Sequence, residues 1–357
     1  MEWLFRSDFE AATIVALWSI AAVLVTTVIL FVYTMGLRLT TVAATRRRDR
    51  FLSTWREIFA SAILSPTTAE NSKLPPLHRH HRVDLLEEWN RACSIVTGSA
   101  SANLITLAGR ANIPELARAL FKKRRINSKI LAVQTFGHLR DTSHKDAIRE
   151  LVSNENTALS ITAAMSLVQI DPDFGISVVV PMIAERRDWP KNRVSIILRI
   201  AGSGRISEPM YRAIRSANGA SRTYLLQFAR LIDAEILDAL LDDLIRSSND
   251  PGVINAALKL VSGYRGVPRI AALTQHDTWF IRMQAAKVLG RTGQQEHLTL
   301  LESLLDDREW WVRYRAAQSI ASLPFLGPNQ MRQIRQRQKD RYAVDILQQA
   351  FAEVGLA

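Results

Sequence analysis

The chain has 357 residues, of which 48% are hydrophobic and 22% charged, and its formal net charge is +12. This composition excludes a chain that is disordered throughout, and the length allows two ordinary domains or one elongated array. The excess of Lys and Arg predicts acidic partners: phospholipid headgroups, nucleic acid or acidic protein faces. The single cysteine, Cys93, excludes an intramolecular disulfide, and its helical spacing from Trp89 predicts a buried packing residue.

The N-terminal region predicts a short tail, residues 1–10, followed by a membrane-spanning helix. Residues 11–37 contain neither a charged residue nor a proline. A helix of about 27 residues is about 40 Å long, which is enough to cross a hydrocarbon core of about 30 Å. A cleaved signal peptide is the alternative. It is disfavoured because the apolar run is too long and because mainly acidic residues precede it.

The charges that flank this segment predict its orientation. Only Arg6 precedes the span, whereas several arginines follow it. The positive-inside rule then puts the N-terminus outside and the C-terminal part in the cytoplasm, as in a single-pass protein of a bacterial inner membrane. The arginines expected to flank the membrane include Arg46, Arg47, Arg48 and Arg50.

Residues 38–64 predict a basic amphipathic helix next to the membrane. Phe51, Trp55 and Phe59 share one face of this helix, and polar residues occupy the rest. Two interpretations remain open. The aromatic face, with Trp55 at the interface, could lie on anionic lipid headgroups, or the helix could cap the array that follows.

Residues 65–82 predict a linker that contains prolines and histidines. The segment includes Pro75-Pro76 and the run His78-Arg79-His80-His81. Adjacent histidines in a flexible segment make a poor metal site, and no carboxylate lies within the run. We therefore expect a solvated basic linker and no bound metal.

The remaining residues, 83–357, contain a repeat of about 31 residues. The segment Trp279-Phe280-Ile281-Arg282 aligns with Trp310-Trp311-Val312-Arg313, and an Ala-Ala pair follows each. In steps of about 29 to 33 residues, the arginine position meets similar patterns at Lys129, Ser160, Arg193, Arg222, Val253 and Val344. Leu-rich stretches lie between these segments. The pattern predicts an all-α stack of about nine helical pairs.

The two clearest repeats resemble the HEAT family, in the variant called PBS-lyase HEAT-like repeats. The residues that carry the resemblance are Asp277, Arg282 and Ala285-Ala286, with Asp307 and Arg313 in the next repeat. The resemblance implies a right-handed α-solenoid in which the aspartate caps a helix and pairs with an arginine of a neighbouring repeat. It does not select an activity, because the family includes adaptors, chromophore lyases and DNA-binding proteins.

Two groups of side chains are candidates for binding a partner. Trp279, Trp310 and Trp311 form the first group. Adjacent residues on a helix point about 100° apart, so one ring of the Trp310/Trp311 pair is expected to face the core and the other to be a contact. The second group is Lys122, Lys123, Arg124 and Arg125, which we expect in a tight turn as a contact for acidic protein or lipid, or simply as a solvated face.

Motifs for chemistry are absent: the sequence has no GxxxxGK[ST], no GxGxxG and no HExxH. No catalytic, cofactor-binding or metal-binding residues are predicted, and His138, His144, His276 and His297 are expected to be solvated or hydrogen-bonded. The sequence favours a membrane-anchored scaffold for a membrane-associated protein, such as an envelope or exopolysaccharide assembly. An enzyme of the chromophore-lyase type is the alternative. Nucleic acid is disfavoured as a partner, because an anchor confines the chain to the membrane surface.

Overall fold

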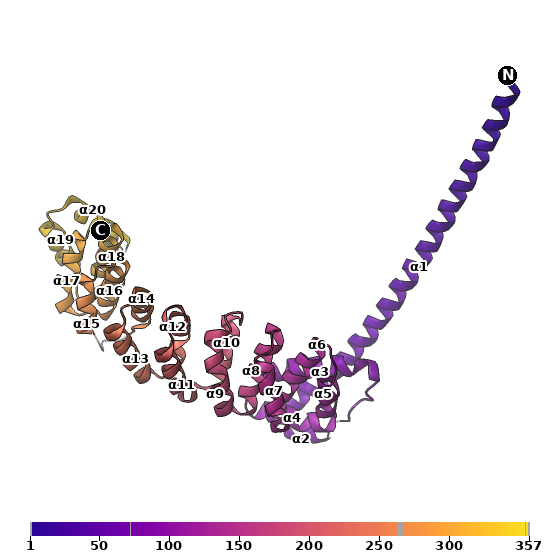
Figure 1. Cartoon of the computed structure of the whole chain (residues 1–357), viewed down its shortest axis with the longest axis horizontal. Helices are drawn as coiled ribbons and strands as arrows, with labels where there is room; N and C mark the ends of the chain where they lie inside the picture. The colour runs from indigo at the N-terminus through magenta and orange to yellow at the C-terminus, as the bar shows by residue number, and fades with distance from the viewer. Residues whose placement is uncertain (1, 72, 263–266, 354, 356–357) are drawn as a thin grey trace. The chain divides into compact units, whose positions relative to one another are not determined.

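The computed structural model describes residues 2–71, 73–262, 267–353 and 355, and all of its regular elements within these ranges are helices. The chain divides into two compact units, Met1–Leu139 and Arg140–Ala357. The expectation of an all-α fold is confirmed for the described residues. Helices α1 to α6 belong to unit 1 and helices α7 to α20 to unit 2 (Figure 1).

Unit 1 begins with a single long helix. Helix α1 runs without a break from Glu2 to Leu64. The predicted tail, membrane span and juxtamembrane helix are therefore parts of one element. The physical reason lies in the sequence, because the first proline of the chain is Pro66 and nothing before it forces the helix to end. The other helices of unit 1 are α2 (Pro66–Asn71), α3 (Arg82–Ile95), α4 (Ser99–Arg110), α5 (Ile113–Phe121) and α6 (Ile126–Leu139).

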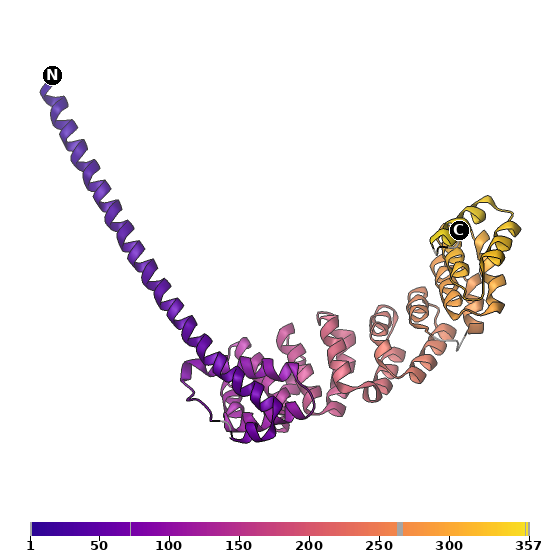
Figure 2. The ribbon, with the colours of Figure 1, turned by 180° about the vertical axis from the view of Figure 1, so that it is seen from behind.

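The C-terminal part of α1 belongs to the core of unit 1. It packs against α3 and α4, and Figure 2 shows it entering this group of helices. Trp55 is 1% exposed, and Phe59 is equally buried. Arg56, on the same part of α1, donates to both carboxylate oxygens of Glu88 on α3, at 2.8 and 3.1 Å. The aromatic face of residues 38–64 therefore packs against helices of unit 1, and a position of this segment beside the membrane stays a prediction.

The segment predicted as a linker is partly ordered on this core. It contains α2 and a 3₁₀ turn, Arg79–His81. The half-buried His81 ring stacks on Phe51 with centroids 4.3 Å apart, and its Nδ1 lies 3.0 Å from the carboxylate of Asp84. Asp84 also accepts a hydrogen bond from Arg48 at 2.7 Å. A solvated linker is thus the wrong description of His81, which fixes the start of α3 to α1.

Unit 2 is a series of helical pairs that follow one another in chain order (Figure 1). The first helices of the pairs are α7 (Lys145–Val152), α9 (Pro172–Glu185), α11 (Ser203–Ser216), α13 (Ala234–Ser247), α15 (Val267–Ala272), α17 (Leu298–Ser303) and α19 (Pro328–Arg337). The second helices are α8 (Thr157–Ile170), α10 (Lys191–Ala201), α12 (Gly219–Leu226), α14 (Pro251–Leu260), α16 (Trp279–Thr292), α18 (Trp310–Ala321) and α20 (Arg341–Glu353).

The predicted repeat frame agrees with these helices. Every position reached from the arginine of the clearest repeats is the third or fourth residue of a second helix, from Lys129 in α6 to Val344 in α20. Within the described part of the chain, α5 to α20 form eight successive pairs, whereas α3 and α4 each pack on α1. The expected ninth pair is thus replaced by the group that contains the end of α1.

Small residues let neighbouring second helices approach closely. The pairs Ala285-Ala286 and Ala316-Ala317 are fully buried. At Gly290 on α16, a Cβ atom would lie 2.5 Å from the Cβ of Ser319 on α18, so that any larger residue would push the two helices apart. This contact holds the two most regular repeats at a fixed spacing.

Candidate functional site

A buried ion pair joins the two repeats that carry the HEAT-like pattern. Arg282 on α16 donates to both carboxylate oxygens of Asp307 at 2.7 Å, and both side chains are almost completely buried. Arg282 also donates to the backbone oxygens of His276 and Asp277. Burial alone would raise the pKa of Asp307, but the hydrogen bonds from Arg282 hold it below its usual value. The predicted pairing of an aspartate with an arginine of a neighbouring repeat is confirmed here.

The same pattern is weaker in the surrounding repeats. Asp307 also accepts from the backbone N–H of Glu309, the N-cap residue of α18, so it holds the turn before the helix and does not have the predicted capping role. At Asp277, in contrast, the backbone oxygen accepts hydrogen bonds from Arg282 and Arg308. Arg313 reaches Asp340 at 3.5 Å, in a more exposed pair. Arg282, Asp307 and Arg313 thus make contacts that hold neighbouring repeats together.

Exposed aromatic rings lie at the start of the second helices. Trp279 is the first residue of α16, Trp310 and Trp311 begin α18, and Tyr342 is the second residue of α20. Their exposed fractions are 38%, 44%, 55% and 68% in that order. We call these four residues the aromatic edge. Because they recur at equivalent positions of successive repeats, they lie on the same edge of the stack.

The expected asymmetry of the tryptophan pair is wrong. Both rings of Trp310 and Trp311 are exposed, and neither enters the core. The rings meet edge to face with centroids 4.8 Å apart, and Trp310 also stacks on Tyr314 at 5.1 Å. At this helix start, two directions about 100° apart therefore both lead to solvent. The pair therefore offers two contact rings instead of one.

A polar hollow lies in the turns beside the aromatic edge. It has a volume of about 390 Å³ and is lined by the turn before α16 and the turn before α18, including His276, Asp277, Asp306 and Arg308. The Arg282–Asp307 pair forms part of its lining. Polar groups at the turns and aromatic rings at the adjacent helix starts together resemble the mixed surface of a protein-binding site.

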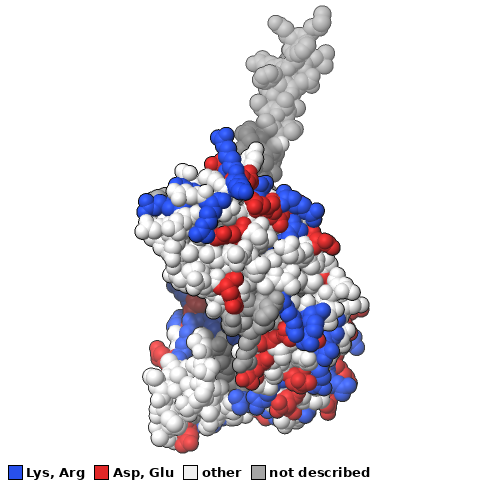
Figure 3. All heavy atoms as spheres, turned by 90° about the vertical axis from the view of Figure 1, so that its left-hand side faces the viewer, with Lys and Arg blue, Asp and Glu red and all other residues white. Residues whose placement is uncertain are grey.

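The predicted basic turn lies in unit 1. Lys122, Lys123, Arg124 and Arg125 connect α5 to α6, and all four side chains are exposed. None of the ion pairs among the described residues involves this turn. On the face shown in Figure 3, however, basic and acidic side chains are interspersed among the coloured residues. This face therefore carries charges of both signs and no continuous basic patch.

The arginines expected at the membrane are exposed on α1. Arg46, Arg47 and Arg50 point to solvent, whereas Arg48 is drawn to α3, where it pairs with Asp84 and, at 3.4 Å, with Glu87. Trp55, expected beside them at the lipid interface, is instead a core residue of unit 1. The sequence alone does not distinguish a lipid-facing from a protein-facing position of Trp55, because an aromatic helix face can pack against either lipid or other helices.

Cys93 and His138 are two titratable side chains that burial affects. Cys93 is buried as expected, and burial raises the pKa of its thiol to about 12. His138 differs from the expectation: its buried Nε2 has no hydrogen-bond partner, and burial lowers its pKa to about 4. Its ring packs edge-on against Trp89 at 6.1 Å. Among the described residues, no three His, Cys, Asp or Glu side chains come together as a metal site would require.

Comparisons with known proteins support the fold. Residues 237–321 match HEAT repeats. This segment runs from α13 to the end of α18 and contains the Arg282–Asp307 pair and three of the four aromatic-edge residues. No curated protein matches the chain.

Two solved structures match the chain at low sequence identity. The crystal structure of Kap121p matches with a TM-score of 0.47 and 12% identity, over 84% of this chain and 37% of that chain. The structure of human deoxyhypusine hydroxylase in complex with glycerol matches with a TM-score of 0.20 and 13% identity, over 77% and 97%. The chain thus spans little more than a third of Kap121p. Neither likeness carries an argument about function.

Proposed function

We propose that the protein is a membrane-anchored scaffold whose HEAT-like repeats bind a protein partner. The observation that carries the proposal is the contrast within α1. Residues Leu17–Leu39 have a mean hydropathy of 2.3, and all of their side chains are exposed in the structure. The same helix ends in the core of unit 1. An exposed apolar cylinder of this length suits the hydrocarbon core of a membrane.

The polar groups within this stretch support the anchor. The hydroxyls of Thr26, Thr27 and Thr34 donate to backbone oxygens four residues earlier, at 2.7 to 2.9 Å. A hydroxyl that is satisfied inside its own helix does not need water, so that it can enter lipid at little cost. Beyond the span, the exposed Arg46, Arg47 and Arg50 suit anionic headgroups. By the positive-inside rule, the repeats lie in the cytoplasm.

The repeats supply the binding surface, and the proposed mechanism is binding without catalysis. The aromatic edge offers large, rigid rings of the kind that dominate protein interfaces. An anchor confines these rings to a thin layer beside the bilayer, which raises their effective concentration toward a membrane-bound partner. An envelope or exopolysaccharide assembly in the inner membrane is the kind of partner that this arrangement would serve.

The membrane part of the proposal is tested by fractionation and by fusions to the C-terminus. The full-length protein should stay in the membrane pellet after carbonate extraction. A C-terminal alkaline phosphatase should be inactive and a C-terminal green fluorescent protein bright. An active phosphatase with a dark fluorescent protein would put the repeats on the other side and contradict the proposal.

The binding part is tested by cross-linked capture from membranes. Replacing Trp279, Trp310 and Trp311 together by alanine should reduce the capture of specific partners by about tenfold or more. The matched control replaces Ile196 and Ile200, two exposed apolar residues of α10, and should capture as the unaltered protein does. Equal capture by all three proteins would remove the aromatic edge from the proposal.

A further inference from the structure

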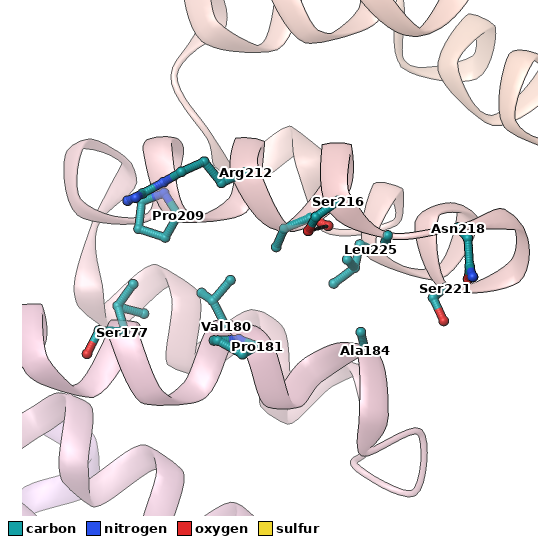
Figure 4. A pocket seen from close by; sticks show the side chains of 13 residues that line it. Ser177, Val180, Pro181, Ala184, Pro209, Arg212, Ser216, Asn218, Ser221 and Leu225 are labelled. Atoms are coloured by element: carbon teal, nitrogen blue, oxygen red, sulfur yellow. Dashed lines mark hydrogen bonds between the residues drawn. The ribbon is translucent and has the colours of Figure 1, made fainter.

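Unit 2 contains a large hollow that no sequence motif indicated. It lies between α9, α11 and α12 and has a volume of about 700 Å³ (Figure 4). Its floor consists of apolar side chains that are buried in the repeat stack, namely Ile176, Val180 and Leu225. A hollow of this size with an apolar floor falls within the range of ligand-binding sites in proteins.

Two prolines and several small residues shape this hollow. Pro181 lies inside α9 and Pro209 inside α11, and Figure 4 shows them on opposite sides of the space. A proline has no N–H, so Pro181 cannot donate to the carbonyl oxygen of Ser177, which also lines the hollow. Ala213 and Ala217 continue the wall of α11 without filling the space. The walls are therefore formed by proline rings and small side chains.

The rim of the hollow is basic. Arg212 is the one charged residue among those that line it, and its partner Glu208 lies 3.3 Å away in a well-exposed pair, which neutralises it weakly. At the α12 end, Arg187 donates to Ser221 Oγ at 3.0 Å, and Lys191 lies over the ring of Tyr224. Lys and Arg outnumber Asp and Glu across residues 172–226. This charge complements an acidic ligand.

We propose that this hollow, between α9, α11 and α12, is the docking groove for an acidic segment of a partner protein that carries one large aromatic side chain. The aromatic ring would occupy the apolar floor between Pro181 and Pro209, and carboxylates on either side of it would meet Arg212 and Arg187. The inference rests on the proposed function and names the chemistry of the segment that binds. A nucleic acid would bring phosphates to the same arginines, so the test below includes an oligonucleotide that distinguishes it from the acidic segment.

The binding test uses the full-length protein in detergent micelles and fluorescein-labelled peptides. The probe is EDEDWDEDE, with EDEDADEDE and KKKKWKKKK as matched peptides. By fluorescence anisotropy, the probe should bind about tenfold more tightly than either matched peptide, and its binding should weaken as salt rises. A single-stranded oligonucleotide that binds as tightly as the probe, or three peptides that bind equally, would overturn the proposal.

Variants locate the site. Arg212→Glu should weaken binding of the probe about tenfold, since it places a like charge on the rim. Ala213→Phe should fill the hollow and have a similar effect. The matched controls are Arg199→Glu on α10 and Ala220→Phe on α12, both at exposed positions outside the lining, and they should bind as the unaltered protein does. Circular dichroism establishes that each variant keeps its helicity.

Cross-linking gives a readout that does not depend on any variant. A probe with p-benzoylphenylalanine in place of its tryptophan should label peptides from residues 176–184 or 209–225. Labelling confined to other parts of the chain would overturn the groove. If the membrane capture depends on the aromatic edge while the probe fails to bind, the groove alone is wrong. If neither captures a ligand, the proposed scaffold function fails with it.

Discussion

The two halves of α1 are made of the same secondary structure but have opposite surroundings. From Leu17 to Leu39, apolar side chains cover the whole circumference and every one of them is exposed. From Phe51 to Ala62, apolar side chains are confined to one face, and that face is buried against α3 and α4. A helix with one apolar stripe can be covered by protein helices on one side, whereas a fully apolar helix needs an apolar solvent all around it.

The largest expected effect follows from placing charge in the first half. Leu24→Arg together with Val28→Arg should move the protein from the membrane pellet to the soluble or aggregated fraction. Each arginine near the centre of a span costs about 2.5–3.5 kcal/mol on insertion scales. The matched control is Ser53→Arg, at an exposed position of the second half. Membrane retention of the double variant would remove the lipid interpretation of α1.

The converse change should act on folding and not on membrane association. Trp55→Ala removes a fully buried ring and should destabilise unit 1 by about 3–5 kcal/mol. Hydrogen exchange in peptides from α3 and α4 would report the loss, while fractionation should be unchanged. Trp18→Ala, at an exposed ring of the first half, should leave exchange in unit 1 unaltered. Equal exchange in both variants would contradict the buried position of Trp55.

A smaller, pH-dependent effect is expected from the ion pair that attaches α1 to α3. The hydrogen bonds from Arg56 hold the pKa of Glu88 below its usual value, although burial opposes this shift. The corresponding stability is fully present above the unfolded pKa of about 4.3 and is lost as the pH falls through the folded pKa. Glu88→Gln should therefore lower the melting temperature of unit 1 at pH 7.

The pH profile distinguishes this pair from a general packing effect. Melting curves of the Glu88→Gln variant and the unaltered protein should converge once the pH has fallen through the lowered folded-state pKa of Glu88, because Glu88 is then protonated in both the folded and the unfolded state. Glu87→Gln is the matched control. Its partner Arg48 lies 3.4 Å away and both side chains are half exposed, so the change should be close to neutral. A constant difference at every pH would contradict the electrostatic origin.

The smallest effect on stability is expected at the aromatic edge. Trp311→Ala should change the free energy of unfolding by about 0.5 kcal/mol, because the ring is more than half exposed. Urea denaturation monitored by circular dichroism would measure it. The same truncation at Trp55 should cost much more free energy of unfolding, because Trp55 lies in the core and Trp311 is exposed. A loss of several kcal/mol would show that Trp311 supports the fold.

The sequence predicted the repeats well because their register repeats. The frame set by Arg282 and Arg313 led to every second helix from α6 to α20, and the Arg282–Asp307 pair was expected from the resemblance. Rotation about a helix axis was harder to predict. The spacing around Trp55, and that of Trp310 and Trp311, predicts which residues share a helix face. It does not predict whether protein, lipid or water covers that face.

The hollow in unit 2 could not be predicted from the sequence for a different reason. It exists because α9 and α12 meet beside α11, and this contact joins residues that lie far apart in the chain. Ile176 to Val180 even has the β-branched composition of a strand, yet it lies inside α9 just before Pro181. A proline inside a helix predicts a kink in that helix. The sequence does not predict that Pro181 of α9 and Pro209 of α11 lie across the hollow from each other.

Because α1 is one unbroken helix, the proposed anchor is a stiff rod and not a flexible tether. About 12 residues separate Leu39 from Phe51, where α1 enters the core of unit 1, so the helix holds that core about 18 Å beyond the span. A flexible tether would let unit 1 explore a hemisphere, whereas a continuous helix holds it at a set height above the headgroups. Transmembrane helices tilt by about 20° on average, and such a tilt displaces the point where α1 enters unit 1 sideways by about 6 Å. Bilayer thickness, which is one influence on tilt, would then change the position of unit 1 relative to the membrane.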